Sequence, residues 1–203
     1  MKLKIKKTDK NTYYQTEFIT REAFWNVYEP GCSEHLILHQ LRKSKSYVNQ
    51  LDLVALCENE IVGHIISTRA YVLDSQNGKH QILCVGPLAI LPSFQNKGIG
   101  SLLINESIKT AAKLGFAGMI LFGNPSFYHR FGFVNAQKYQ ITTKDFQNFE
   151  PFMALELFEN SLCNVNGCFY EDESFSVDKK DLEMFEKQFP YKEKQITDTQ
   201  FKH

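Results

Sequence analysis

The stretch that decides the fold runs from Cys84 to Leu103 and reads CVGPLAILPSFQNKGIGSLL. An apolar run typical of a buried strand leads into a turn with Gly98 and Gly100, and an amphipathic pattern starts directly afterwards. The first turn of a helix carries unpaired N–H groups and the positive end of the helix dipole, so it attracts anions. Glycines let the backbone approach a phosphate without a Cβ in the way. The stretch therefore predicts a strand, a phosphate-binding turn and a helix, and Lys97 adds positive charge.

Two common phosphate motifs do not fit this turn. A dinucleotide-binding fingerprint requires a third glycine at the position of Leu103. A Walker A loop requires a lysine between Gly100 and Ser101. A Gly-x-Gly at a helix start is also compatible with an ordinary helix that binds nothing. The residues alone indicate a place that suits a phosphate or pyrophosphate, and no more.

Helical and strand patterns alternate before the turn. Lys2–Lys6 alternates between polar and apolar residues, as a half-buried strand does. Residues 11–46 have a helical pattern with a break at Pro30-Gly31, after which Ser33 is placed to cap a second helix. An antiparallel meander is then predicted from three strand patterns: Leu51–Cys57, Ile61–Leu73 and Gln81–Leu91.

The pattern after the turn changes to strand–helix–strand. A helix is predicted over Gly98–Leu114 with Gly115 as its C-cap, followed by a strand over Ala117–Phe122. A short helix over Asn124–Phe131 and a strand from Phe133 follow, and crossovers of this kind predict parallel neighbours. The tail adds strand candidates Phe152–Leu157 and Leu162–Tyr170 and a closing helix Asp178–Gln188 with Leu182 and Phe185 inward. The sum is an α/β fold with a mixed sheet, antiparallel first and parallel later.

Composition limits the function classes. The 203 residues are 43% hydrophobic and carry 23 lysine plus arginine against 23 aspartate plus glutamate. This balance argues against a net positive electrostatic potential that would attract nucleic acid or an anionic membrane. Neither a membrane span nor a secretory signal is visible, so a cytoplasmic protein is expected. The five cysteines are odd in number and form no CxxC pair, which favours reduced thiols: Cys32, Cys57, Cys84, Cys163 and Cys168.

Two signatures together resemble a known family. Gln95-x-x-Gly98-x-Gly100, after a strand and before a helix, resembles the acetyl-CoA signature of the GNAT superfamily. The stretch NPSFYHRFGF at residues 124–133 resembles the second signature at the expected distance. Three further segments are similar to the YhbS-like branch: GPLA from Gly86, FYHRFGF from Phe127 and FMALEL from Phe152. The resemblance covers residues 51–170 and is strongest over 84–133.

This resemblance implies a fold and a co-substrate. The expected fold is the GNAT fold, with a mixed sheet and helices on both faces, over residues 1–170. Residues 171–203 are expected to be a C-terminal helical extension packed on the same domain. Acetyl-CoA is the implied co-substrate, with backbone groups at Leu88 and Ile90 alongside its pantetheine arm. The implied coenzyme-binding residues are Leu88, Ala89, Ile90, Gln95, Asn96, Lys97, Gly98, Ile99, Gly100, Ser101, Asn124 and Tyr128.

The resemblance also implies an N-acetyltransferase in which an amine attacks the thioester directly. Tyr128, four residues before Gly132-Phe133, is the expected general acid for the coenzyme A thiolate. A core aromatic is the alternative interpretation of this tyrosine. Several members place a glutamate base on the fourth strand, but Leu83–Val85 contains no carboxylate. A water relay, another residue or no dedicated base all remain open, and Cys84 is better explained as a buried thiol than as a nucleophile.

The acceptor site is expected around Trp25–His35, where polar and aromatic residues flank the Pro-Gly break. Glu34 and His35 are the candidates for recognition or deprotonation of the amine. A helix-capping glutamate and a surface histidine are equally compatible with the sequence. Cys32, His35 and His39 have loose metal-ligand spacing but lack a distant partner motif, so no metal is expected.

Two functions follow from these observations. The first is an enzyme that acetylates a primary amine on a small molecule, a peptide or a protein. The second is a non-catalytic acetyl-CoA-binding sensor or partner module of the same fold. The missing strand carboxylate favours the second, and Tyr128 favours the first. Neither nucleic acid nor a membrane is expected as a partner, and both a monomer and a homodimer remain open.

Overall fold

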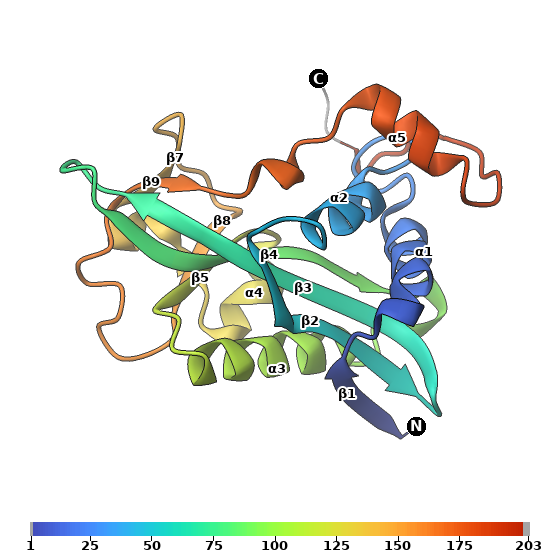
Figure 1. Cartoon of the computed structure of the whole chain (residues 1–203), viewed down its shortest axis with the longest axis horizontal. Coiled ribbons are helices and arrows are strands. Elements are labelled where there is room, and N and C mark those ends of the chain that lie inside the picture. The colour runs from blue at the N-terminus through green and yellow to red at the C-terminus, as the bar shows by residue number, and fades with distance from the viewer. Residues whose placement is uncertain (1, 201–203) are drawn as a thin grey trace.

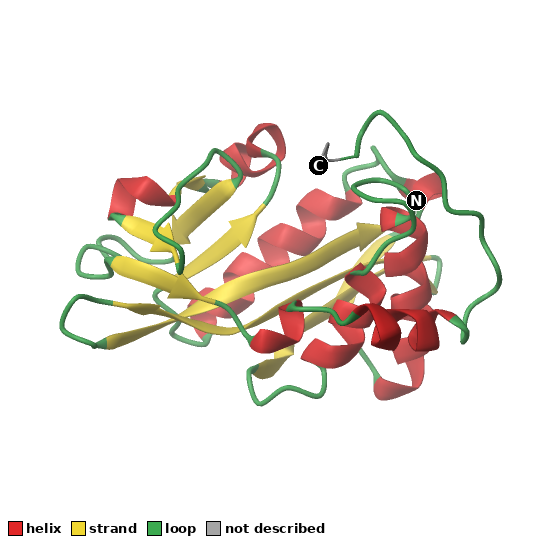
Figure 2. Ribbon diagram, turned by 90° about the horizontal axis from the view of Figure 1, so that it is seen from above, coloured by secondary structure: helices red, strands yellow, loops and turns green. Residues whose placement is uncertain are grey.

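A mixed sheet forms the centre of the computed structural model, which describes residues 2–200, and helices cover both faces of the sheet (Figures 1 and 2). The strands are β1 (Leu3–Lys7), β2 (Tyr47–Cys57), β3 (Glu60–Leu73), β4 (Lys79–Ile90), β5 (Gly118–Phe122), β6 (Val134–Asn135), β7 (Ile141–Thr143), β8 (Phe152–Glu156) and β9 (Gly167–Tyr170). The helices are α1 (Tyr13–Phe24), α2 (Glu34–Leu41), α3 (Ile99–Lys113), α4 (Pro125–Tyr128) and α5 (Lys179–Glu186). The predicted helical break at Pro30-Gly31 is confirmed, because it lies between α1 and α2.

The strand order is β1-β2-β3-β4-β5-β8-β6, and β9 pairs with the end of β3 and with β7. Strands β2 to β4 form the predicted antiparallel meander, and β1 adds an antiparallel strand beside β2. The crossover through α3 makes β4 and β5 parallel neighbours, as predicted. The short second crossover was expected to do the same for β6, and that prediction is wrong. β8 bonds antiparallel along the whole of β5 and occupies the edge that β6 would need.

Two terminal segments also differ in extent from the sequence patterns. The strand expected from Leu162 begins only at Gly167, because residues 162–165 fold into a turn with Val165 N–H donating to Leu162 O at 3.1 Å. The closing helix is confirmed as α5, where the Asp178 side chain caps the N–H groups of Lys180 and Asp181. Sequence patterns thus located both elements but not all of their ends.

A bulge at Gly86-Pro87 redirects β4 in the middle of the sheet. Leu88 pairs with Ile65 and Val85 with Ser67, so two residues of β4 face one residue of β3. Pairing with β5 stops at Cys84, after only two registered pairs. Proline lacks the N–H that a ladder needs, which is why a bulge is the tolerated place for it. Beyond Cys84, no strand among the described residues pairs with β4 on the side of β5.

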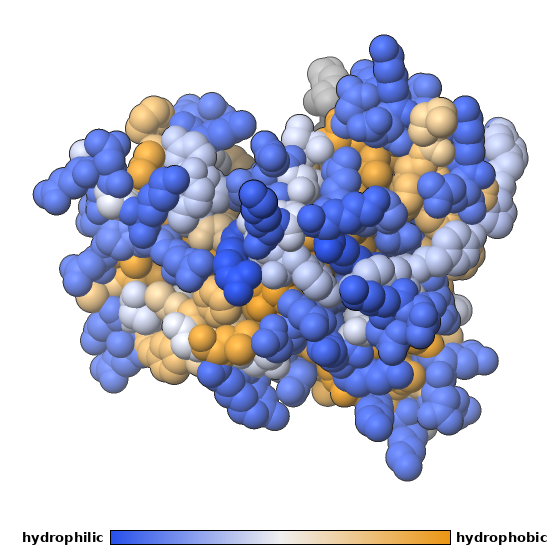
Figure 3. Space-filling model, viewed as in Figure 1, coloured by the Kyte–Doolittle hydropathy of each residue, from blue (hydrophilic) through white to orange (hydrophobic). Residues whose placement is uncertain are grey.

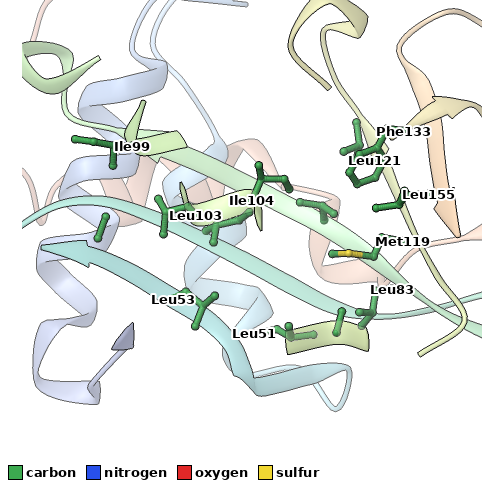
Figure 4. Packing of buried hydrophobic residues seen from close by; sticks show 14 of the residues in the cluster. Leu51, Leu53, Leu83, Ile99, Leu103, Ile104, Met119, Leu121, Phe133 and Leu155 are labelled. Atoms are coloured by element: carbon green, nitrogen blue, oxygen red, sulfur yellow. The ribbon is translucent and has the colours of Figure 1, made fainter. Parts of the chain in front are cut away.

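One face of the sheet packs on α3 (Figure 4). Leu103, Ile104 and Ala111 of α3 are fully buried against the strands. Figure 4 shows Leu53 and Leu83 of the sheet directed into the same core as Met119 and Phe133. This core holds the start of α3 at a fixed place beside β4.

The opposite face packs on α1 and α2. Ile19 of α1 belongs to a cluster with Val54, and Leu41 of α2 to a cluster with Ile66. The expected covering of both faces is therefore confirmed. Phe185 of α5 packs in turn on Leu36 of α2. Within residues 2–200, no helix combines the length and the apolar character needed to span a bilayer.

A buried polar network fixes α2 on the sheet. Arg42 Nε lies 3.0 Å from Asp52 Oδ2, and His64 Nε2 lies 2.7 Å from Asp52 Oδ1. Tyr47 also donates its hydroxyl to Asp52 at 2.9 Å. Burial alone would raise the pKa of Asp52, but the bonds from His64 and Arg42 hold it below its usual range. A charged, fully bonded Asp52 therefore anchors the C-terminal end of α2 to β2.

Candidate active site

The start of α3 forms an open cradle for an anion. Gly98 is the N-cap residue with φ of 79°, in the left-handed region that favours glycine. The first bond inside the helix runs from Leu102 N–H to Gly98 O at 3.2 Å. The N–H groups of Ile99, Gly100 and Ser101 precede that bond and have no partner within the helix. A Cβ on Gly98 would meet no atom within 4 Å, so the cradle is open on this side.

The side chains of the turn are tied to the turn itself. Gln95 Nε2 donates to Ile90 O at 3.2 Å, and Lys97 Nζ donates to Ser93 O at 2.8 Å. Asn96 takes a φ of 60°, which asparagine tolerates better than most residues. These bonds shape the turn and leave the backbone N–H groups at the start of α3 as the donors available to an anion.

The edge of β4 beyond the bulge continues the cradle. Leu91 N–H donates to Val62 O of β3 at 3.0 Å. Because backbone groups alternate sides along a strand, those of Leu88 and Ile90 point away from β3, toward the unpaired edge. Ile90 O agrees with this direction, since it accepts from Gln95. The same alternation turns the backbone of Ala89 toward β3, so only Leu88 and Ile90 present free donors.

α4 lies beside the start of α3 and carries Tyr128. A Cβ on Gly100 would lie 3.4 Å from Phe127 Cζ and 3.9 Å from side-chain carbons of Leu88 and Ile90. Asn124 caps α4 by accepting from Ser126 N–H at 2.9 Å. The Tyr128 ring packs edge-on against Phe127 and lies where a Cβ on residue 123 would overlap it, so Gly123 makes room for it. The structure thus brings the helix start, the β4 edge and Tyr128 together.

Burial raises the pKa of Tyr128 to about 12, and the neighbouring phenol of Tyr28 adds to the shift. Tyr28 lies in the loop between α1 and α2, and its own pKa is raised by burial and then by the charge of Glu34. Tyr28 is thus near enough to Tyr128 to raise its pKa, and Glu34 is near enough to raise that of Tyr28. Tyr28 lies inside the expected acceptor segment, but no sequence pattern distinguishes it from its neighbours.

Glu34 is the first residue of α2, and its carboxylate accepts from Ser33 N–H at 3.0 Å. Ser33 holds the N-cap position, but its side chain makes no capping bond. Burial raises the pKa of Glu34, and its backbone bonds oppose that shift only partly. Glu34 thus combines a helix-start position with the electrostatic coupling to Tyr28.

His35 points toward α5 and is completely buried, so the interpretation as a surface histidine is wrong. Its ring contacts those of Phe185 and Phe189 with centroids 5.5 and 5.2 Å away. His35 Nε2 lies 3.0 Å from Glu186 Oε2, at ion-pair distance but not aligned as a hydrogen bond. Burial lowers the pKa of His35 to about 4, which keeps the ring neutral at pH 7. Its described contacts join α2 to α5 and do not reach Tyr128.

The cysteines and histidines near α2 make local contacts. Cys32 Sγ lies 3.5 Å from His35 Nδ1, whereas His39 Nδ1 lies 3.0 Å from Glu17. In the part of the chain that the structure describes, no three His, Cys, Asp or Glu side chains are arranged to hold a metal ion. All five cysteines are free thiols.

Sequence reasoning missed one carboxylate beside β4. Glu171 follows β9, and its Oε2 lies 3.9 Å from Sγ of the buried Cys84. The residue as a whole is exposed, but partial burial of its carboxyl raises the pKa. Cys84 is the last residue of β4 paired with β5, so Glu171 lies where the strands part. No local pattern signals this, because the pairing of β9 with β3 brings Glu171 there.

The family comparison agrees with this geometry. Residues 49–135, which include β4, the turn, α3 and Tyr128, match the family described as "Acetyltransferase (GNAT) domain". This stretch of the chain is similar to a GNAT acetyltransferase domain. The mixed sheet with its helices on both faces is accordingly the GNAT fold.

Relatives of this chain include two N-acetyltransferases of Escherichia coli that are described as uncharacterized. YjhQ is 30% identical over 97 residues, which are 48% of this chain and 53% of YjhQ, so the match spans about half of that relative. YhbS is 25% identical over 145 residues, 71% of this chain and 84% of YhbS. The similarity to the YhbS-like branch is thereby confirmed.

Solved structures share the fold. The crystal structure of Escherichia coli YhbS in complex with CoA matches with a TM-score of 0.76 at 22% identity, covering 86% of this chain and 92% of that one. A GNAT acetyltransferase from Brucella melitensis in complex with acetyl-CoA matches with a TM-score of 0.69 at 24% identity, covering 86% and 99%. At this identity the likeness establishes the fold alone.

Proposed function

We propose that this protein transfers the acetyl group of acetyl-CoA to a primary amine of a small molecule, a peptide or a protein. The neutral amine attacks the thioester carbonyl, an N–C bond forms and the C–S bond breaks. A base takes one proton from the nitrogen, and Tyr128 protonates the departing thiolate. The observation that carries this proposal is the convergence of the β4 edge, the start of α3 and α4 around Gly100.

These residues fit acetyl-CoA as a co-substrate. The N–H groups of Ile99, Gly100 and Ser101 suit a pyrophosphate, since a helix start offers both donors and a favourable dipole. The free edge at Leu88 and Ile90 suits an arm containing amides, because a strand edge presents alternating N–H and C=O groups. The CoA and acetyl-CoA complexes of the Escherichia coli and Brucella melitensis proteins support the same assignment.

Tyr128 suits the role of the acid because it stays protonated at neutral pH. Its pKa of about 12 lies above the ordinary pKa of a thiol, ~8.5, so transfer to a free thiolate is uphill. A positive charge on the attacking nitrogen favours the phenolate and narrows that gap. We therefore expect Tyr128 to donate while the nitrogen still carries its proton.

Two carboxylates are candidates for the base. Glu34 is near enough to Tyr28 to raise its pKa, and Tyr28 in turn raises the pKa of Tyr128. Glu171 lies beside Cys84, where β4 and β5 separate. Burial raises the pKa of both, and a raised carboxyl pKa brings a base closer to the neutral range where it is most useful. His35 would act on Glu34 through the position of α2, since its ring faces α5.

A panel of primary amines tests the function directly. With acetyl-CoA and a suitable amine, the protein should release free thiol in step with acetylated amine. Binding of acetyl-CoA without release for any small-molecule, peptide or protein amine would favour the sensor or partner module instead. The free state of all five cysteines fits a reducing compartment, and we place the reaction in the cytoplasm on that ground.

The pH dependence of kcat/KM separates the two bases. Glu34→Gln or Glu171→Gln should remove the acidic limb of the profile, whichever carboxylate is the base, and lower kcat/KM about a hundredfold near pH 7. Glu173→Gln, an exposed neighbour of Glu171, is the matched control. An unchanged acidic limb in both variants would leave proton removal to water.

A further inference from the structure

The tail that follows α5 returns to the loop between α1 and α2 (Figure 1). Residues 190–200 contain neither helix nor strand. After Phe189 the tail borders a hollow of about 600 Å³ whose other walls include Trp25 and α5. Because no helix or strand holds residues 190–200, their position depends on the contacts that the last of them make with the loop.

Asn26 is hydrogen-bonded both to the other end of its own loop and to the tail. Its N–H donates to Gly31 O at 2.8 Å and its Oδ1 accepts from Gly31 N–H at 2.7 Å, so the two ends of the loop are bonded together. The same Oδ1 accepts from Gln195 N–H at 3.1 Å, and Nδ2 donates to Glu193 O at 3.2 Å. Asn26 adopts a φ of 61°, in the left-handed region that asparagine tolerates. One side chain thus joins the loop and the tail.

Further tail side chains bond the backbone of this loop. Thr197 Oγ1 donates to Asn26 O at 2.9 Å, and Gln200 Nε2 donates to the same oxygen at 3.2 Å. Thr199 Oγ1 donates to Val27 O at 2.6 Å. The residue after Val27 is Tyr28, whose phenol influences the pKa of Tyr128. The tail is thus hydrogen-bonded to the loop at Val27, the residue before Tyr28.

α5 is held by separate contacts, so the tail can loosen while the helix stays in place. Arg21 Nε donates to Glu186 Oε1 at 2.8 Å, and Arg21 Nη2 donates to Pro190 O at 3.0 Å. Lys192 Nζ lies 2.7 Å from Glu22 Oε2. These contacts anchor the chain up to residue 192. The bonds of residues 193–200 act on the loop.

The molecular surface is indented between the part that carries β7 and the part that carries α2 and α5 (Figure 3). Tyr28, from the loop between α1 and α2, is 43% exposed. The loop leads directly into Glu34, the first residue of α2 and one of the two candidate bases, so Tyr28 lies in the segment where we propose that the acceptor amine binds. A displacement of the loop would move this acceptor wall, while the cradle at α3 keeps its own bonds.

We propose that residues 193–200 position the Trp25–Gly31 loop and thereby determine how tightly the acceptor amine binds. The inference rests on the proposed acetyl transfer. Asn26, Thr197 and Thr199 are positioning residues, because they act through the loop and Tyr28 and not on the reacting atoms. The acceptor site is then built jointly by the two ends of the chain.

A double variant, Thr197→Val with Thr199→Val, tests this inference. Valine keeps the size of threonine and removes the two hydroxyl donors to the loop. We expect KM for the amine to rise about tenfold, with kcat changed less than about twofold and the affinity for acetyl-CoA unchanged. Amide hydrogen exchange over residues 25–31 should become faster.

Ile196→Thr is the matched control, because Ile196 is in the same tail and 89% exposed. It should leave both KM and exchange as in the parent. Unchanged exchange in the double variant would overturn the positioning role, and faster exchange with an unchanged KM would overturn its link to the amine. If the parent protein acetylates no amine, the proposed function fails, and the exchange measurement still decides whether the tail holds the loop.

Discussion

The proposed coenzyme side and the proposed acceptor side of this protein are built in opposite ways. The cradle uses one continuous stretch, from the edge of β4 through the turn into α3, and its donors are backbone groups. The proposed acceptor side combines Tyr28 and Glu34, from the N-terminal part of the chain, with Glu171 and the tail, from the C-terminal part. A continuous backbone motif tolerates changes elsewhere in the sequence. Substitutions among side chains from distant segments can change which acceptor amine binds without disturbing the coenzyme site.

The largest effect is expected on the coenzyme side, from Gly98→Glu. The variant sets a carboxylate where the anion should lie, and it also strains a residue with φ of 79°. We expect acetyl-CoA affinity to fall at least about a thousandfold in a calorimetric titration.

Gly115→Glu is the control for that variant. Gly115 ends α3 with the same φ of 79°, and a Cβ there also meets no atom within 4 Å. It should bear a similar backbone strain and leave acetyl-CoA binding unchanged. An equal loss of acetyl-CoA affinity in both variants would mean that backbone strain causes the effect. It would contradict the proposal that the cradle binds the anion.

An intermediate effect is expected where the two sides meet, from Tyr128→Phe. Loss of the phenolic proton should lower kcat between about 10² and 10⁴-fold, while the packed ring and the acetyl-CoA affinity stay as they are. Tyr170→Phe, a tyrosine stacked on Tyr71 at the far end of β3, should turn over normally. A normal rate for Tyr128→Phe would reduce Tyr128 to a core aromatic.

The smallest effect concerns stability on the acceptor side. The folded pKa of His35, about 4, lies below its unfolded value of 6.5, so the unfolded chain takes up the proton first. The stability that His35 contributes is complete above pH 6.5 and declines as the pH falls toward 4, by at most about 3 kcal/mol. His35→Phe should flatten this part of the curve of unfolding free energy against pH. His64 is also held neutral by burial and remains in both proteins, so their difference reports His35. If the two curves ran parallel, His35 would not contribute to the pH dependence, because α5 would move aside and let the folded protein bind the proton.

The sequence predicted the turn at the start of α3 and most of the sheet, because those features depend on residues that are close together in the chain. The Gly98 and Gly100 turn, the helix after it and the three-strand meander all depend on local patterns. The position of β8 between β5 and β6, the approach of Glu171 to Cys84 and the grip of the tail on Asn26 all join segments far apart in the chain. Their cause is tertiary pairing, which periodicity does not encode. His35 illustrates the limit, since only the packing of α5 decides that it is buried.

A nuclear magnetic resonance titration with coenzyme A tests the central claim most directly. The account predicts that the largest amide shifts belong to Ile99, Gly100 and Ser101 at the start of α3 and to Leu88 and Ile90 on the free edge of β4. Ala89, whose N–H faces β3, should shift less than its two neighbours. Binding that leaves these amides unmoved, or that moves Ala89 as much as Leu88 and Ile90, would contradict it.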